Sequence, residues 1–178
     1  MKKGIYLIFL LLIFNSCEKS INYDDLKDVD NVWMHKGQPY TGFVFNLVRG
    51  KKISSGKIFK GKKEGRWNER GTIIVHHGVY KNGLRDGKWL GKYKPDSTLG
   101  YTGSYKNNLK SGKWEGYHRN GKVQYGGYYK NGLKEDTWKY WYDNGILSDS
   151  GKYTNGIESG IWKFYNEDGS FKKEKVYN

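Results

Sequence analysis

A ten-residue stretch that recurs along this 178-residue chain constrains its fold more than any other feature. "YKNGLRDGKW" occupies residues 80–89, and close copies follow at 105–114, 129–138 and 153–162. A fixed period of 20 to 50 residues is typical of a repeat array, in which each unit packs only against its neighbours. The tryptophans of the array are separated by 22, 25, 24 and 24 residues and are Trp67, Trp89, Trp114, Trp138 and Trp162.

Each repeat also carries two turn signals, one before the tryptophan and one after it. Asn-Gly and Asp-Gly suit the positive φ angles of tight hairpin turns, so each repeat is predicted to be strand, turn, strand, turn. The absence of alanine, with 25 glycines and 16 tyrosines, disfavours helices and favours strands. We therefore expect an all-β fold, an elongated single-layer antiparallel β-meander of repeated hairpins. Its turn glycines are Gly83, Gly132 and Gly156 before the tryptophan, and Gly121, Gly145 and Gly169 after it.

The order Gly-x-Tyr-x-Asn-Gly, Gly-x-Trp and Tyr-x-x-Asn-Gly resembles the bacterial variant of the MORN repeat (membrane occupation and recognition nexus). Departures are local: Asp136-Thr137 replaces Gly-Lys before Trp138, and Asn108 replaces a turn glycine. The resemblance implies a curved single-sheet solenoid over residues 32–178. Proteins of this type are often labelled YwqK-family antitoxins, but a repeat scaffold can host unrelated partners. The matching residues are Gly103, Tyr105, Gly112, Trp114, Tyr117, Asn120 and Gly121, and again Gly151, Tyr153, Asn155, Gly156, Gly160, Trp162, Tyr165 and Gly169.

The N-terminus has the features of an export signal. Lys2 and Lys3 precede an apolar run over residues 5–14, and Ser16-Cys17 then resembles a bacterial lipobox. Because Cys17 is the only cysteine, it has no disulfide partner within the chain, and lipidation explains its presence. The alternative is an ordinary signal peptide with an accidental cysteine. The first interpretation places the protein in the bacterial cell envelope, exported and lipid-anchored, with the leaflet left open.

The predicted domain organisation follows from these segments. Residues 1–16 form the lipoprotein signal peptide, and residues 17–31, polar and acidic, form a flexible tether that begins with the lipidated cysteine. Residues 32–178 form the repeat domain. A degenerate first repeat at 32–55 acts as a cap, and full repeats follow at about 56–77, 78–102, 103–126, 127–150 and 151–174.

The sequence contains no arrangement typical of an enzyme. His76-His77 is the only pair that suggests a metal site, but neighbours in a strand point to opposite faces. Ser54-Ser55 has no nearby base, and the glycines recur with the turns instead of forming a phosphate loop before a helix. We expect no catalytic residue, no metal and no cofactor.

Basic residues recur with the repeat and suggest a binding surface. Residues 31–178 hold 28 of the 32 Lys and Arg and 13 of the 18 Asp and Glu, a net charge of 28 − 13 = +15. Lys88, Lys113 and Lys163, each next to a tryptophan, are candidate contacts for lipid headgroups, anionic polysaccharide or an acidic protein. The alternative is a solvated face whose lysines prevent strand pairing. An aromatic-led site would instead use rings such as Tyr117, Trp141 and Tyr165 on the face opposite the repeat tryptophans, where we expect a second aromatic ladder.

Two function classes remain. The favoured one is a non-enzymatic, membrane-anchored scaffold that binds a protein or an anionic envelope component through its aromatic and basic sheet face. The alternative is a toxin-neutralising protein, either an antitoxin or an envelope immunity lipoprotein, although an exported chain cannot meet a cytoplasmic toxin. Nucleic acid is disfavoured because the charge is diffuse and the chain is exported. The oligomeric state and the partner's identity stay open.

Overall fold

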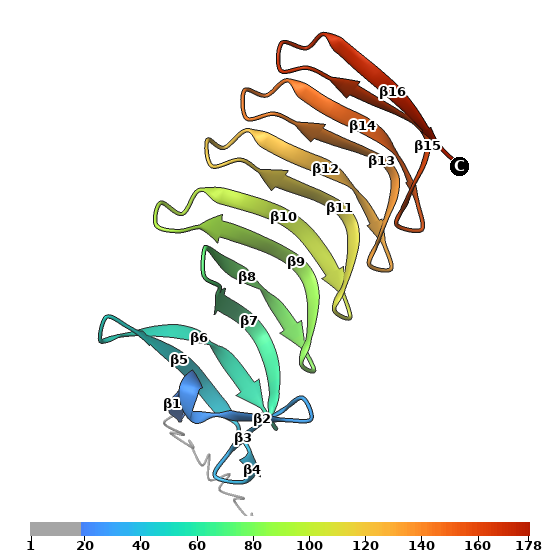
Figure 1. Ribbon diagram of the computed structural model, residues 1–178. Helices are drawn as coiled ribbons and strands as arrows, with labels where there is room; N and C mark the ends of the chain where they lie inside the picture. Colours follow the sequence, from blue (N-terminus) through green and yellow to red (C-terminus); the bar gives the residue numbers. More distant parts are fainter. Residues whose placement is uncertain (1–18) are drawn as a thin grey trace, which may run out of the picture.

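The computed structural model describes residues 19–178, and the predicted signal peptide and Cys17 lie outside the described residues. The chain forms a long curved ribbon of strands (Figure 1), with 13 strands in the order β1-β5-β6 and then consecutively to β16. All neighbours are antiparallel except β1 and β5, and the sheet does not close on itself. The all-β, single-layer meander expected from the sequence is therefore confirmed. Within residues 19–178, no helix is both long and apolar enough to cross a membrane.

The elements have the following bounds. A small second sheet contains β2 (Lys27–Val29), β3 (Val32–His35) and β4 (Gln38–Pro39), and a short 3-10 turn, η1, spans Tyr23–Asp25. The large sheet contains β1 (Ser20–Asn22), β5 (Gly42–Val48), β6 (Lys51–Phe59), β7 (Lys62–Arg70), β8 (Ile74–Lys81), β9 (Leu84–Tyr93), β10 (Leu99–Lys106), β11 (Leu109–Tyr117), β12 (Val123–Lys130), β13 (Leu133–Trp141), β14 (Leu147–Thr154), β15 (Ile157–Tyr165) and β16 (Phe171–Tyr177).

The two turns of a repeat have different geometry. The first turn holds two successive residues at positive φ, as in Asn131 at 51° and Gly132 at 84°, which matches the twist of a two-residue hairpin. Asn108 adopts the turn conformation with φ of 67°, and its Oδ1 accepts the N–H of Arg85 at 2.6 Å. In the second turn of the last three repeats only the glycine has positive φ, at Gly121, Gly145 and Gly169.

Each tryptophan-bearing strand also bulges two residues before its ring. Gly112 has φ of 71° there, and the register with the preceding strand shifts between Thr102 and Ser104. Asp136, the sequence departure at the equivalent position, takes φ of 58° and keeps the bulge. A non-glycine residue in this region is strained, although Asp tolerates it better than most.

The first residues after position 19 differ from the expected tether. β1 pairs with β5, Leu26 is buried, and the Tyr23 ring lies 4.7 Å from that of Trp33 and 6.3 Å from that of Trp67. This segment is therefore folded instead of remaining a flexible linker: β1 pairs with β5 of the first hairpin, and β2 pairs with β3 of the small sheet. The physical reason is that Trp67 has no full repeat before it, so the apolar side chains of this otherwise polar segment cover it.

The boundary of the predicted capping repeat also moves. Residues 32–39 of the expected 32–55 unit belong to the small sheet, and the first hairpin of the large sheet is β5–β6. This hairpin pairs with β7 only over Lys57–Phe59 and Lys62–Glu64. Beyond Glu64 the two strands separate, so that the β5–β6 tip stands away from β7 and β8 (Figure 1).

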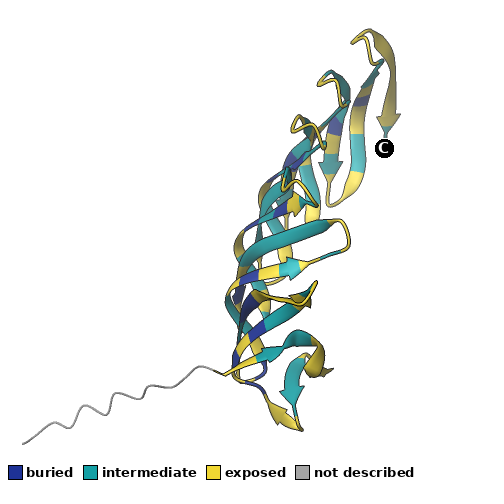
Figure 2. Ribbon diagram, turned by 90° about the vertical axis from the view of Figure 1, so that its left-hand side faces the viewer, coloured by how far each residue is buried: buried dark blue, intermediate teal, exposed yellow. Residues whose placement is uncertain are grey.

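The repeat tryptophans form the core of the array. All five are 1–2% exposed, and Figure 2 shows the buried residues recurring in strand after strand along the ribbon. Each ring covers a glycine of the preceding strand: a Cβ at Gly103 would lie 2.1 Å from a ring carbon of Trp114. The indole N–H of Trp114 donates to the Ser104 carbonyl at 3.1 Å, and the other four rings repeat this bond at 3.1–3.2 Å. The fold therefore needs no central core, because every repeat buries its ring against its neighbour.

Candidate anion-binding site

The sheet has two faces with different chemistry. Successive side chains of a strand alternate, so Trp114 lies on one face, and Lys113, Glu115 and Tyr117 lie on the other. We call the side that carries the repeat tryptophans the Trp face and the opposite side the back face.

Cations and aromatic rings alternate along the Trp face. The position four residues before each tryptophan holds a basic residue in four of the five repeats, and Tyr105 and Tyr129 flank the ring of Trp114 at 5.2 and 5.8 Å. The Lys110 ammonium lies 4.5 Å from the Trp114 ring centre and 4.9 Å from that of Tyr129. Cations in such positions stabilise the aromatic stack by cation–π attraction. The basic residues of this row are Lys63, Arg85, Lys110 and Lys134.

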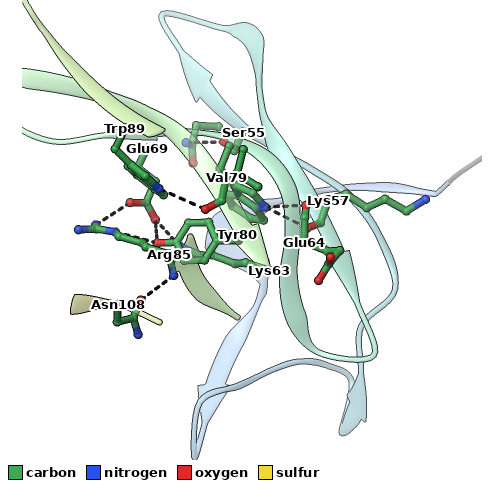
Figure 3. Close-up of polar contacts among 12 residues, drawn as sticks. Ser55, Lys57, Lys63, Glu64, Glu69, Val79, Tyr80, Arg85, Trp89 and Asn108 are labelled. Atoms are coloured by element: carbon green, nitrogen blue, oxygen red, sulfur yellow. Dashed lines mark hydrogen bonds and ion pairs between the residues drawn. The ribbon is translucent and has the colours of Figure 1, made fainter. Parts of the chain in front are cut away.

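Glu69 neutralises the first two cations of this row (Figure 3). Its carboxylate accepts from Lys63 at 2.6 Å, from Arg85 at 2.8 Å and from the Tyr80 hydroxyl at 2.7 Å. Burial alone would raise the pKa of Glu69, but the hydrogen bonds and charges of these partners outweigh burial and hold that pKa below its ordinary value. The cluster is a satisfied network that fixes the N-terminal repeats.

Further along the Trp face, Lys110 and Lys134 form no ion pair with a carboxylate of residues 19–178. Burial lowers the pKa of Lys110 and of Lys134. The Lys134 ammonium donates to the Tyr140 hydroxyl at 2.6 Å, so its partners are phenols and ring faces. Half-buried lysines that pack against rings in this way contribute to the stack and offer little free charge to a ligand.

The back face carries a hollow of about 390 Å³ beside two of the expected lysines. Lys88 and Lys113 line it together with His77, Leu90, Thr102 and Ser104, so the structure brings two of the three predicted lysines together. None of the lining residues is acidic. We call this volume the central hollow.

A second volume of about 530 Å³ adjoins the central hollow at His77, and we call it the basic hollow. Arg70, Val75 and Lys92 lie opposite one another on β7, β8 and β9, which places them on the same face. The β5–β6 tip and the loop after β9 supply the remaining walls. These walls add Arg49, Lys94 and Pro95, and no acidic residue of the described part of the chain lines the volume.

The third predicted lysine does not join these hollows. Lys163 lies on β15, in register with Ser150 and Glu174, four strands beyond β11. Lys113 is itself partly neutralised, because its ammonium lies 2.7 Å from a Glu115 oxygen in an exposed ion pair. The three lysines are therefore not equivalent members of a ladder.

The predicted back-face aromatics do not form a second ladder. Tyr117, Trp141 and Tyr165 are each half-buried, and within residues 19–178 no ring contact joins any two of them. The Tyr117 hydroxyl donates to Glu115 at 2.9 Å. The backbone carbonyls of the three residues accept hydrogen bonds from Tyr93, His118 and Tyr142 of the preceding repeats. The continuous aromatic stack lies on the Trp face, where a glycine of the preceding strand leaves room for each repeat tryptophan.

The two adjacent histidines face opposite sides, as alternation requires. His76 Nδ1 lies 2.8 Å from the Tyr101 hydroxyl, whereas His77 Nδ1 lies 2.7 Å from Asn68 Oδ1 on the back face. Among residues 19–178, no group of three or more His, Cys, Asp or Glu side chains is placed to hold a metal ion. The candidate site therefore rests on charge and shape alone.

The fold and the two hollows define an open repeat sheet with a basic back surface. No family model matches the chain, and no curated protein matches it. A structural match is TarM of S. aureus, solved as a variant with fondaparinux, α-GlcNAc-glycerol and UDP, at 14% identity and a TM-score of 0.30. A second TarM structure gives 15% identity and a TM-score of 0.29. Each match covers 53% of this chain, which spans only about a fifth of TarM (21% and 20%), and likeness this low carries no argument about function.

Sequence reasoning missed most of the residues that line the basic hollow. Arg70 and Lys92 occupy the same repeat position, three residues after Trp67 and Trp89, but the later repeats have an aromatic residue there. Arg49 lies in the β5–β6 turn, outside the full repeats, so a search for basic residues that recur through the whole array passes over all three. One signal was present: the loop Pro95-Asp96-Ser97 replaces the usual Asn-Gly turn, and it borders the hollow.

Proposed function

We propose that this protein is a non-enzymatic, membrane-anchored binding scaffold that docks an anionic partner on its back face. The observation that carries the proposal is the pair of adjoining hollows over β7–β11, lined by several cations and by no carboxylate. The Trp face is a poorer candidate because its cations pack against rings or pair with Glu69.

Charge in such a hollow favours anions in two ways. Clefts lined by one sign of charge concentrate oppositely charged ligands, and each lysine near an anionic surface contributes about 1 kcal/mol. Lys88, Lys92 and Lys113 lie on paired strands, so a partner would not need to order the backbone that carries them.

A titration with dextran sulfate, with neutral dextran as the reference, tests the proposal. Replacing Lys88, Lys92 and Lys113 together by Gln should weaken binding by about a hundredfold, since three lysines correspond to about 3 kcal/mol. Binding should also weaken as salt rises, because screening shortens the reach of surface charges.

The matched control removes the same charge from the same face outside the hollows. Lys130, Lys139 and Lys163 are exposed there, and their joint replacement by Gln should change affinity by less than about threefold. If both triple variants lost the same affinity for dextran sulfate, the back face would be only a solvated, generally basic surface. A wild-type protein that does not bind dextran sulfate would remove the proposal altogether.

A further inference from the structure

We propose that the basic hollow binds a phosphate group carried on a sugar, either as a free sugar phosphate or as a unit of a phosphate-bearing polysaccharide. The inference rests on the proposed function and deepens it, because it assigns a ligand chemistry to one part of the back face.

The first observation is that three cations around the hollow are not neutralised. Arg49, Arg70 and Lys92 make no ion pair with any carboxylate of residues 19–178. Three free positive charges around one volume favour a ligand with more than one negative charge. A phosphate monoester carries about −1.5 to −2 at pH 7, whereas a carboxylate carries only one charge.

The second observation is the kind of cation and how it is held. Two of the free groups are guanidinium ions, whose planar donors match phosphate oxygens bidentately. A fourth charge is fixed in place, because the Lys94 ammonium donates to the carbonyls of Gly71 at 2.5 Å and Thr72 at 3.4 Å. The one carboxylate of the neighbouring loop, Asp96, is turned onto the N–H of Thr98 at 3.0 Å and does not line the hollow.

The third observation is the volume of the basic hollow and the apolar residues that line it next to the cations. The volume of about 530 Å³ lies within the 300–1,000 Å³ usual for small-molecule sites. Val48, Val75 and Pro95 line it next to the cations, which gives the C–H surface of a sugar an apolar wall. A bare phosphate ion would use only the charged part.

The hollow also exists because the repeat is broken in two places. The β5–β6 hairpin separates from β7 after Glu64, which places Arg49 at the rim. The loop containing Pro95 and Ser97 replaces the compact turn of the later repeats. An array built for stability alone does not need either departure, since the other repeats fold with regular turns.

One of the two causes that lower the pKa of His77 agrees with a positive potential at this place. Burial, and then the charge of Lys92, lowers the pKa of His77. Its Nδ1 is already engaged with Asn68, so the ring borders both hollows in a fixed orientation.

Isothermal titration with glucose 6-phosphate, glucuronate and glucose tests the inference. Glucose 6-phosphate should bind at least about tenfold tighter than glucuronate, and glucose should not bind. The variant Arg49→Gln/Arg70→Gln should weaken glucose 6-phosphate binding at least about tenfold, while Lys130→Gln/Lys139→Gln on the same face should leave it unchanged. Circular dichroism should be identical for all variants, because these four residues are exposed.

Titrations with a polymer distinguish the two possible sources of the ligand. Tighter binding of phosphorylated dextran than of glucose 6-phosphate assigns the site to a polysaccharide, and the reverse assigns it to the free sugar phosphate. Equal affinity for glucuronate and glucose 6-phosphate would overturn the inference. The inference would also be overturned if a single-stranded oligothymidylate bound more than about tenfold tighter than phosphorylated dextran, since nucleic acid would then be the ligand. If glucose 6-phosphate fails to bind while dextran sulfate still binds through Lys88 and Lys113, the inference fails and the proposed function stands.

Discussion

Replacing Trp114 by Ala should remove the largest single contribution to the middle of the array. The ring is 2% exposed, and its N–H donates to the Ser104 carbonyl at 3.1 Å. Tyr105 and Tyr129 contact it edge-on at 5.2 and 5.8 Å. Truncating a buried Trp costs about 3–5 kcal/mol, and edge-to-face pairs add about 0.5–1.5 kcal/mol each beyond their area. Because the Ser104 carbonyl also loses its partner, we expect a loss in the upper part of the range, about 4–5 kcal/mol.

Urea unfolding of residues 19–178, followed by circular dichroism, measures this loss as a lower midpoint at constant slope. The control is Trp141→Ala, which removes a half-buried ring from the back face and should cost less than about 2 kcal/mol. The reasoning is refuted if Trp114→Ala costs less than about 1.5 kcal/mol, or if the two variants lose equal stability.

Three further substitutions test separate parts of the account. Gly103→Ala should lower the free energy of unfolding by about 3 kcal/mol or more, because the new Cβ would lie 2.1 Å from the Trp114 ring. Gly126→Ala, whose Cβ would have no neighbour closer than 3.7 Å, should be nearly neutral in the same unfolding assay. Asp136→Gly should raise stability by about 0.5–1 kcal/mol by relieving the φ of 58°, and a loss of stability would show that the carboxylate matters more than the backbone. Cys17→Ser should release the protein from membranes or leave an unprocessed precursor in cell fractionation, since acyl chains give stable attachment, and normal processing with wild-type membrane binding would exclude lipidation.

The repeat made the fold predictable, because period, turn and ring position all agree. Asn131-Gly132 defines a hairpin, and Trp138 seven residues later defines the face that must be buried. Local rules fail where the array ends. Residues 20–31 look like a polar linker by composition, and only the absence of a full repeat before Trp67 gives Tyr23 and Leu26 a cluster to pack into.

The candidate site was only partly predictable for a related reason. Lys88 and Lys113 repeat in the sequence, and they do line one hollow. Arg49 and Lys92 lie far apart in the chain and line the same hollow, beside which the pairing of β6 with β7 ends at Glu64. Such a separation depends on strand pairing between specific registers, which periodicity does not reveal.

Lysine footprinting tests most directly whether the back face is the binding surface. The protein is acetylated with an amine-reactive ester, with and without dextran sulfate, and each lysine is quantified by mass spectrometry. We predict that the polymer protects Lys88 and Lys92 on the back face and leaves Lys110 and Lys134 on the Trp face unchanged. Protection of Lys110 and Lys134 instead, or equal protection of all four, would contradict the account.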